Sequence, residues 1–211
     1  MKILTIANSS KCDFAFFMGK ILADAYPNVI VIDNSSNHEL FNAVLNPVDE
    51  EDKKCEMITR SNVTYLKDVD YSPDFFKTFD YIVVYEGDTV QEGYLKHSDV
   101  VVSMPDHKPE TLKNIHKMPD NCDFIMRDGV PKININSAAA LMDINKERII
   151  GILPYDPEDY SHYLSLLYNG RQHFKGLSDE YMQALTYVTI KLTGENEKTV
   201  EKFIKKERKN G

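Results

Sequence analysis

Short apolar runs alternate with helical segments along the whole of this 211-residue chain. Several runs are continuous stretches of Val and Ile, which is typical of strands buried on both faces of a parallel sheet. Parallel neighbours need a crossover connection, which a helix supplies. The pattern predicts an α/β domain, doubly wound, with a mostly parallel sheet of about six to eight strands and helices on both faces. The expected strands are 2–8, 29–33, 62–66, 81–85, 99–104, 123–126 and 148–153, and the expected helices are 14–26, 38–45, 72–77, 109–118, 137–142, 158–168, 178–192 and 195–209.

Composition and length indicate one folded domain. Hydrophobic residues make up 42% of the chain and charged residues 27%, which is ordinary for a globular protein. We expect residues 1–194 to form that domain and residues 195–211 to form a basic C-terminal helix or tail. The formal charge of −8 argues against strong binding to nucleic acid, because such binding needs a basic face.

Targeting and metal-binding patterns are missing from the sequence. Its first residues show no signal peptide, and no apolar stretch approaches the roughly 20 residues that span a bilayer. The three cysteines are far apart, and the six histidines show no zinc-binding spacing. We therefore expect a cytoplasmic protein without a metal site.

The segment between the first expected strand and the first expected helix lies where such domains carry a phosphate-binding loop. That loop needs glycines for its backbone N–H groups to wrap a phosphate, a lysine for the phosphates and a hydroxyl for Mg²⁺. None of its residues here is a glycine, so we interpret the segment as a relic of a nucleotide loop. Its residues are Asn8, Ser9, Ser10, Lys11, Cys12 and Asp13.

Several segments of the sequence occur in an order that matches a known protein family. Residues 4–25 read as strand, loop and helix, residues 29–33 as a strand that ends in an aspartate, and residues 79–84 as a further buried strand. Residues 98–105 read as a strand that ends in a proline turn. In this order they resemble the ParA/MinD family of deviant Walker ATPases, with residues 79–84 at the Walker B strand. The resemblance covers most of the chain and implies a P-loop NTPase-like fold.

One turn resembles a particular branch of that family. It consists of Pro154, Tyr155, Asp156 and Pro157, and Asn169-Gly170-Arg171 follows about a dozen residues later. This pairing is similar to a stretch of the CpaE/TadZ branch, whose members position pilus assembly machinery.

The resemblance is lost at the loop residues that would hold a nucleotide. In an ungapped match, Phe14 replaces the last loop glycine, and Ala15 replaces the Walker lysine. Phe16 and Phe17 replace the hydroxyl pair. The family's signature lysine falls on Ser10, next to Lys11.

The residues at the positions of the family's metal ligands also differ from those of the family. Tyr85 stands where the Walker B aspartate would be, with Glu86 beside it, and only Asp33 is in place. The loss of the lysine together with the metal ligands removes most of the electrostatic stabilisation on which phosphoryl transfer depends. The resemblance therefore implies a degenerate site, without a catalytic residue and without a bound cofactor.

The loop residues leave alternatives open. Lys11 is either a phosphate-binding lysine that has shifted by one position or a solvated loop lysine. Ser9, Ser10 and Asp13 are candidates to cap the following helix, and an aspartate there would repel a phosphate. Cys12 lies at a predicted helix N-terminus, a position that can lower the pKa of a thiol, but no histidine is assigned nearby to support a catalytic role.

The aromatic and acidic residues around the loop also allow two interpretations. Phe14, Phe16 and Phe17 form either a docking patch or part of the core, and we favour the core. Asp33 and Glu86 would both lie at the carboxyl edge of the sheet, where they are either cation ligands or a carboxylate relic without metal. We favour the relic.

The C-terminal segment is basic in an otherwise acidic chain. Val200, Phe203 and Ile204 give it one narrow apolar edge, and Lys205 and Lys206 lie beside that edge. The segment is a candidate for weak membrane or partner binding, at the inner face of the membrane. The alternative is a final helix packed on the domain.

We expect a non-hydrolysing scaffold or localisation factor, a pseudo-ATPase that acts as a dimer or through a protein partner, for example in pilus or secretion assembly. The resemblance implies a dimer surface through residues 9–13, 33–37 and 106–109.

Three rival functions remain. The first is an atypical ATPase of partition or cell positioning that binds ATP and Mg²⁺ through Lys11 and Asp33. The second is a DNA-partition adaptor, which the acidic charge disfavours. The third is a small-molecule enzyme that uses Cys12 or Glu86.

Overall fold

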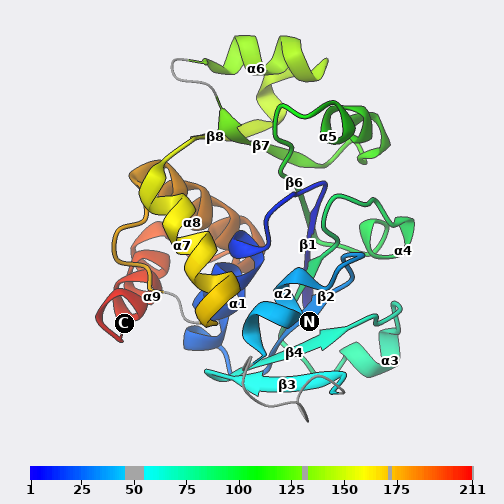
Figure 1. Ribbon diagram of the computed structural model, residues 1–211. Helices are drawn as coiled ribbons and strands as arrows, with labels where there is room; N and C mark the ends of the chain where they lie inside the picture. The colour runs from blue at the N-terminus through cyan, green and yellow to red at the C-terminus, as the bar shows by residue number, and fades with distance from the viewer. Residues whose placement is uncertain (46–54, 130–132, 171–172, 211) are drawn as a thin grey trace.

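A single sheet of eight strands crosses the molecule in the computed structural model, which describes residues 1–45, 55–129, 133–170 and 173–210 (Figure 1). The strand order is β3-β4-β2-β5-β1-β6-β7-β8. Among the strands of the described residues, only β3 is antiparallel to its neighbour. The prediction of a doubly wound, mostly parallel sheet is confirmed. The strands are β1 (Lys2–Ala7), β2 (Val29–Asp33), β3 (Met57–Arg60), β4 (Val63–Lys67), β5 (Tyr81–Tyr85), β6 (Val100–Ser103), β7 (Asp123–Gly129) and β8 (Ile149–Pro154).

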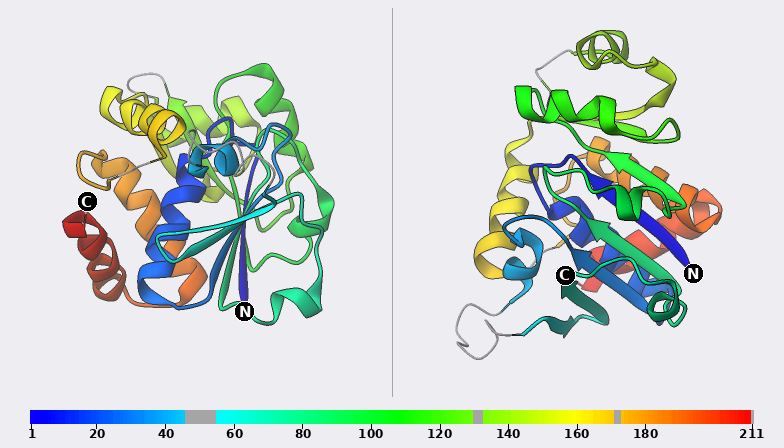
Figure 2. Two further views of the ribbon diagram at one scale, coloured as in Figure 1. Left: turned by 60° about the horizontal axis from the view of Figure 1, so that its bottom comes forward. Right: turned by 90° about the vertical axis from the view of Figure 1, so that its right-hand side faces the viewer.

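Helices cover both faces of this sheet (Figure 2). On one face, α1 and α8 pack directly on the strands, and α9 packs on α1 and α8. On the other face, α3 and α4 cover the central strands, while α5 and α6 cover β6 to β8. The helices are α1 (Asp13–Ala25), α2 (Glu39–Val44), α3 (Pro73–Phe76), α4 (Glu92–Leu95), α5 (Pro109–Asn114), α6 (Ile135–Met142), α7 (Pro157–Asn169), α8 (Asp179–Thr193) and α9 (Glu197–Asn210).

The central strand β1 shows why the apolar runs are continuous. Leu4 and Ile6 face the core beneath α1, whereas Ile3 and Ala7 face the cores on the opposite side. Successive side chains of a strand point to opposite faces, so a strand covered on both faces carries apolar residues at most of its positions. Burial of Ile3, Leu4 and Ile6 contributes about 1.5–3 kcal/mol for each side chain.

Strand β3 is a correction to the sequence-based prediction, which has no strand between residues 34 and 61. Its side chains alternate between exposed and half-buried at the edge of the sheet. Ser61 and Asn62 connect it to β4 with φ angles of 49° and 63°, as a two-residue hairpin turn requires. Without a glycine in that turn, the sequence carries no strong hairpin signal. The predicted loop 47–54 and Arg171 lie outside the described residues.

The C-terminal helix α9 packs on the domain. Val200 is fully buried, Ile204 is buried in the same core, and Phe203 lies half-buried beside them. The Lys206 ammonium lies 2.7 Å from the Asp24 carboxylate of α1. The narrow apolar edge therefore faces the protein core. Within the described ranges, no helix has the length and apolar character needed to cross a membrane.

Candidate functional site

The loop from Asn8 to Cys12 leaves β1 at the carboxyl edge of the sheet and is tied to the end of β5. The Ser9 N–H donates to the Gly87 carbonyl at 2.7 Å, and the Tyr85 hydroxyl donates to the Ser9 carbonyl at 3.2 Å. Asn8 has a φ of 52° and donates from its side-chain amide to the Thr111 carbonyl. These contacts hold the loop against its neighbours.

A buried ion pair lies at the N-terminus of α1. Arg127 donates two hydrogen bonds to Asp13, from Nη1 to Oδ1 at 2.6 Å and from Nη2 to Oδ2 at 2.9 Å. The two side chains are only 5% and 2% exposed. Asp13 Oδ1 also accepts from the Phe14 N–H at 3.0 Å. Burial alone would raise the pKa of Asp13, but the charge and hydrogen bonds of Arg127 outweigh it and lower that pKa.

Arg127 was not among the predicted site residues. It lies near the end of β7, where a register shift between Met126 and Gly129 marks an irregularity of the β7–β8 pairing. Asp128 there has a φ of 50°. Such irregularities change the direction in which side chains point. The only signal in the sequence is a charged residue that follows the apolar run of a buried strand.

Lys11 pairs with Asp128. Its ammonium lies 2.8 Å from the carboxylate, and its side chain is 13% exposed. It also lies 5.1 Å from the ring centre of Tyr160 and 5.7 Å from that of Tyr163. The interpretation of Lys11 as a solvated loop lysine is therefore wrong, because Asp128 and α7 enclose it.

The helix-capping interpretation of the loop also needs correction. Cys12 is the N-cap residue of α1 and makes no side-chain capping bond. Ser9 Oγ instead donates to the Lys11 carbonyl at 2.9 Å, and Ser10 Oγ donates to Asp106 at 3.1 Å. Asp13 alone accepts a hydrogen bond from a backbone N–H of the helix.

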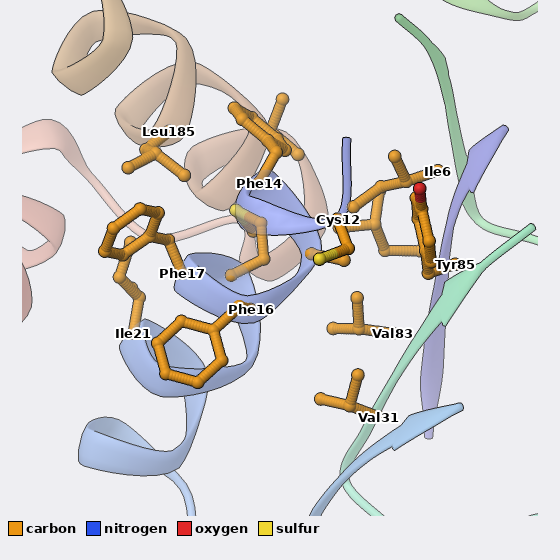
Figure 3. Packing of buried hydrophobic residues seen from close by; sticks show 14 of the residues in the cluster. Ile6, Cys12, Phe14, Phe16, Phe17, Ile21, Val31, Val83, Tyr85 and Leu185 are labelled. Atoms are coloured by element: carbon orange, nitrogen blue, oxygen red, sulfur yellow. The ribbon is translucent and has the colours of Figure 1, made fainter. Parts of the chain in front are cut away.

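The Cys12 thiol is fully buried between α1 and the strand that carries Val83 and Tyr85 (Figure 3). Burial raises its pKa well above the usual value, and the nearby carboxylates of Glu39 and Asp13 raise that pKa further. The expected lowering by the helix N-terminus is therefore reversed. A thiol in this state is a poor nucleophile, so the structure does not favour the enzyme alternative that uses Cys12.

The Asp33 carboxylate accepts hydrogen bonds from nearby backbone N–H groups. Its Oδ1 accepts from the Ser35 N–H at 3.0 Å, and its Oδ2 accepts from the Phe41 N–H at 2.8 Å. Burial raises the pKa of Asp33, although these donors oppose the rise. The carboxylate ties the end of β2 to α2.

Glu86 is buried and contacts a different segment. Its Oε2 accepts from the Gln91 N–H at 3.1 Å, while no described residue contacts its Oε1 by a hydrogen bond. Burial raises the pKa of Glu86 to about 7. Asp33 and Glu86 therefore do not share partners. In the part of the chain that the structure describes, no cluster of three or more His, Cys, Asp or Glu side chains is suited to a metal ion.

The phenylalanines of α1 belong to the core (Figure 3). Phe14 and Phe17 are fully buried, and Phe16 is 6% exposed. The ring centre of Phe17 lies 4.8 Å from that of Phe174, and that of Phe14 lies 5.8 Å from that of Tyr181. These residues therefore pack with the domain and leave no free aromatic patch.

The turn at 154–157 begins α7. Asp156 Oδ1 accepts from the N–H groups of Glu158 and Asp159 at 2.8 and 3.0 Å, and Pro157 is the first residue of the helix. This is a standard N-terminal cap. Tyr155 is 57% exposed beside it.

Several groups of the loop that could contact a nucleoside triphosphate are already bonded within the protein. The N–H groups of Ser9 and Phe14 already donate within the protein, and Lys11 is paired. The helix N-terminus, where a phosphate would bind, holds the carboxylate of Asp13. On the surface that the resemblance implied for a dimer, the exposed residues are Ser36, Asn37, His107, Lys108 and Pro109.

Three solved structures share the fold. A chain of the MinC:MinD cell division protein complex of Aquifex aeolicus matches with a TM-score of 0.63 at 13% identity, over 93% of this chain and 97% of that chain. A ParA family ATPase of Chlorobium tepidum matches with a TM-score of 0.53 at 12% identity, over 96% and 97%. The pNOB8 ParA protein bound to nonspecific DNA matches with a TM-score of 0.52 at 12% identity, over 97% and 99%.

These matches show that the chain has the fold of the ParA and MinD ATPases. No protein-family model and no curated protein matches it by sequence. At 12–13% identity the likeness extends to the fold, and the chemistry has to be argued from the residues.

Proposed function

We propose that this protein is a non-hydrolysing scaffold or localisation factor that acts by dimerising or by binding a protein partner. The observation that carries the proposal is the ion pair between Asp13 and Arg127 at the N-terminus of α1. A helix N-terminus attracts an anion, and here that anion is a carboxylate of the chain itself.

A triphosphate would have to displace this carboxylate. Removing one partner of a buried ion pair costs about 3–5 kcal/mol, which corresponds to a loss of about two to four powers of ten in affinity. Lys11 would also have to leave Asp128, where it lies enclosed by tyrosine rings. In this proposal, contacts with a partner do not depend on a bound nucleotide.

The proposed biological process rests on one short segment of the sequence. The turn at 154–157 resembles that of the CpaE/TadZ branch, which supports a role in positioning pilus or secretion assembly in the cytoplasm. The same turn caps α7, so a structural requirement also accounts for its sequence.

Two measurements test the scaffold role together. Phosphate release from ATP and Mg²⁺ is expected to equal the buffer blank, for the protein and for Lys11→Ala alike. The sedimentation coefficient is expected to stay the same with and without ATP. Turnover that Lys11→Ala abolishes, or assembly that requires ATP, would replace the proposal with the ATPase alternative.

That alternative is an ATP-binding ATPase of partition or cell positioning, and the fold favours it. A partition role would require DNA binding, for which the net charge of −8 is unfavourable. We expect no shift of plasmid DNA at physiological salt. A shift that weakens steeply as salt rises would support the partition role.

A further inference from the structure

A groove of ≈ 700 Å³ runs between α8 and α9 on the face of the sheet that these helices cover. On each helix the lining positions recur at intervals of three to four residues, so one stripe of each helix faces the groove. The stripe on α8 extends over the 12 residues from Asp179 to Ile190, which corresponds to a rise of about 17 Å along the helix axis. The lining residues are Asp179, Met182, Gln183, Thr186, Tyr187 and Ile190 of α8, and Glu197, Glu201, Ile204 and Lys205 of α9.

The groove combines apolar lining residues with acidic ones. Met182 and Ile190 are half-buried, and Tyr187 is 44% exposed. A large aromatic side chain on the surface is a typical anchor for a partner. The apolar part of the groove therefore offers contact area that the folded chain itself does not use.

Three carboxylates accompany these apolar side chains. Glu201 pairs with Lys205 at 2.8 Å. For Asp179 and Glu197, the described residues provide no ion pair. The uncompensated charge of the groove is therefore negative, and the net charge of −8 adds a favourable long-range field for a basic partner.

We propose that this groove binds a basic amphipathic helix of a partner protein. Such a helix would place apolar side chains spaced by three and four residues against Met182, Tyr187 and Ile190, and lysines or arginines opposite Asp179 and Glu197. A length of about 17 Å accommodates about three helical turns of the partner.

A second copy of this chain is a poorer occupant. Its own basic helix is α9, but Val200 and Ile204 of that helix are buried in the core. To enter the groove of another copy, α9 would have to leave its own domain.

This inference rests on the partner-binding part of the proposed function. It does not depend on the claim about ATP, because none of the groove residues makes the loop contacts described above. Groove variants and nucleotide measurements can therefore fail separately.

The test uses a synthetic amphipathic peptide with leucines at positions spaced by three and four and lysines at the others, measured by fluorescence anisotropy. A second peptide carries glutamate at every lysine position. We expect the full-length protein to bind the lysine peptide at least about tenfold more tightly than the glutamate peptide. Equal affinity for the two peptides, or no binding of either, would overturn the proposal.

Matched variants locate the binding. Asp179→Asn and Tyr187→Ser are each expected to weaken binding of the lysine peptide severalfold. Glu180→Gln and Tyr168→Ser, which change exposed residues outside the groove, are expected to leave it unchanged. The proposal is wrong if Asp179→Asn and Tyr187→Ser change the affinity for the lysine peptide no more than Glu180→Gln and Tyr168→Ser do.

Other occupants would give different results. Self-association detected by sedimentation and lost in Tyr187→Ser would assign the groove to a second copy. Binding to vesicles of anionic lipid that Tyr187→Ser abolishes would assign it to a membrane surface. Either result would overturn the proposal of a partner helix.

Discussion

Asp13 and Arg127 lie 114 positions apart in the sequence and meet at the N-terminus of α1. Around them, Lys11 pairs with Asp128, and the buried Cys12 thiol lies close to Glu39. At the scale of single residues, the positions that would bind phosphate in a nucleotide loop instead bind other residues of the chain. This change decides the proposed function.

The ion pair is expected to contribute strongly to stability. Arg127→Met leaves the Asp13 carboxylate buried without its partner, so we expect the free energy of unfolding to fall by about 3–5 kcal/mol. Urea unfolding measures this difference. Lys96→Met, which removes an exposed ion pair with Glu92, serves as the control and is expected to cost much less, because solvent screens an exposed pair. Equal losses in the two variants would contradict the assignment.

Glu86 is expected to make stability depend on pH. Because its pKa in the folded protein is about 7, above the 4.5 of a free glutamate, the folded state binds more protons between these values. Stability from this residue is therefore present at low pH and is lost as pH rises through 7, by at most about 3 kcal/mol.

The variant Glu86→Gln removes that dependence while it keeps an acceptor for the Gln91 N–H. We expect the stability of Glu86→Gln relative to wild type to be higher at pH 8 than at pH 5, as measured by urea unfolding at each pH. The same difference at both pH values would show that Glu86 does not titrate in this range.

Which of these residues the sequence could reveal depends on distance along the chain. The missing glycines and the exchanged lysine are visible within the loop itself. The partner of Asp13 cannot be identified from the loop sequence. The direction of the chain around Arg127 and Asp128 depends on an irregularity in β7, and no local sequence pattern predicts that irregularity. The raised pKa of Cys12 likewise needs carboxylates from other elements.

At the scale of elements, the buried strands were predictable because burial on both faces leaves a continuous apolar run. The predicted bounds 29–33 and 81–85 coincide with β2 and β5. The edge strand β3 was missed, since it has one exposed face and a Ser-Asn turn. The predicted helix 109–118 is divided into α5 and a 3₁₀ turn at Ile115–Lys117.

The cap of α7 gives a prediction at this scale. Asp156→Ala removes the acceptor for two backbone N–H groups, so we expect a loss of about 0.5–2 kcal/mol in the free energy of unfolding. Tyr155→Ser in the same turn changes an exposed side chain and is expected to stay within about 0.5 kcal/mol of wild type. If Asp156→Ala unfolds at the same urea concentration as wild type, the turn is not needed as a cap.

At the scale of the whole molecule, the chain has the fold of the ParA and MinD ATPases, while its loop is held by internal contacts. The groove between α8 and α9 is formed by other residues than those of the loop. In the proposed function, the fold therefore serves as a rigid platform, and partner binding does not require a nucleotide cycle.

Calorimetric titration of the purified protein with ATP and Mg²⁺ tests the central claim most directly. Because Asp13 holds the phosphate position and Lys11 is paired, we predict a dissociation constant no lower than about 1 mM. A micromolar dissociation constant that is lost in Lys11→Ala would contradict the claim.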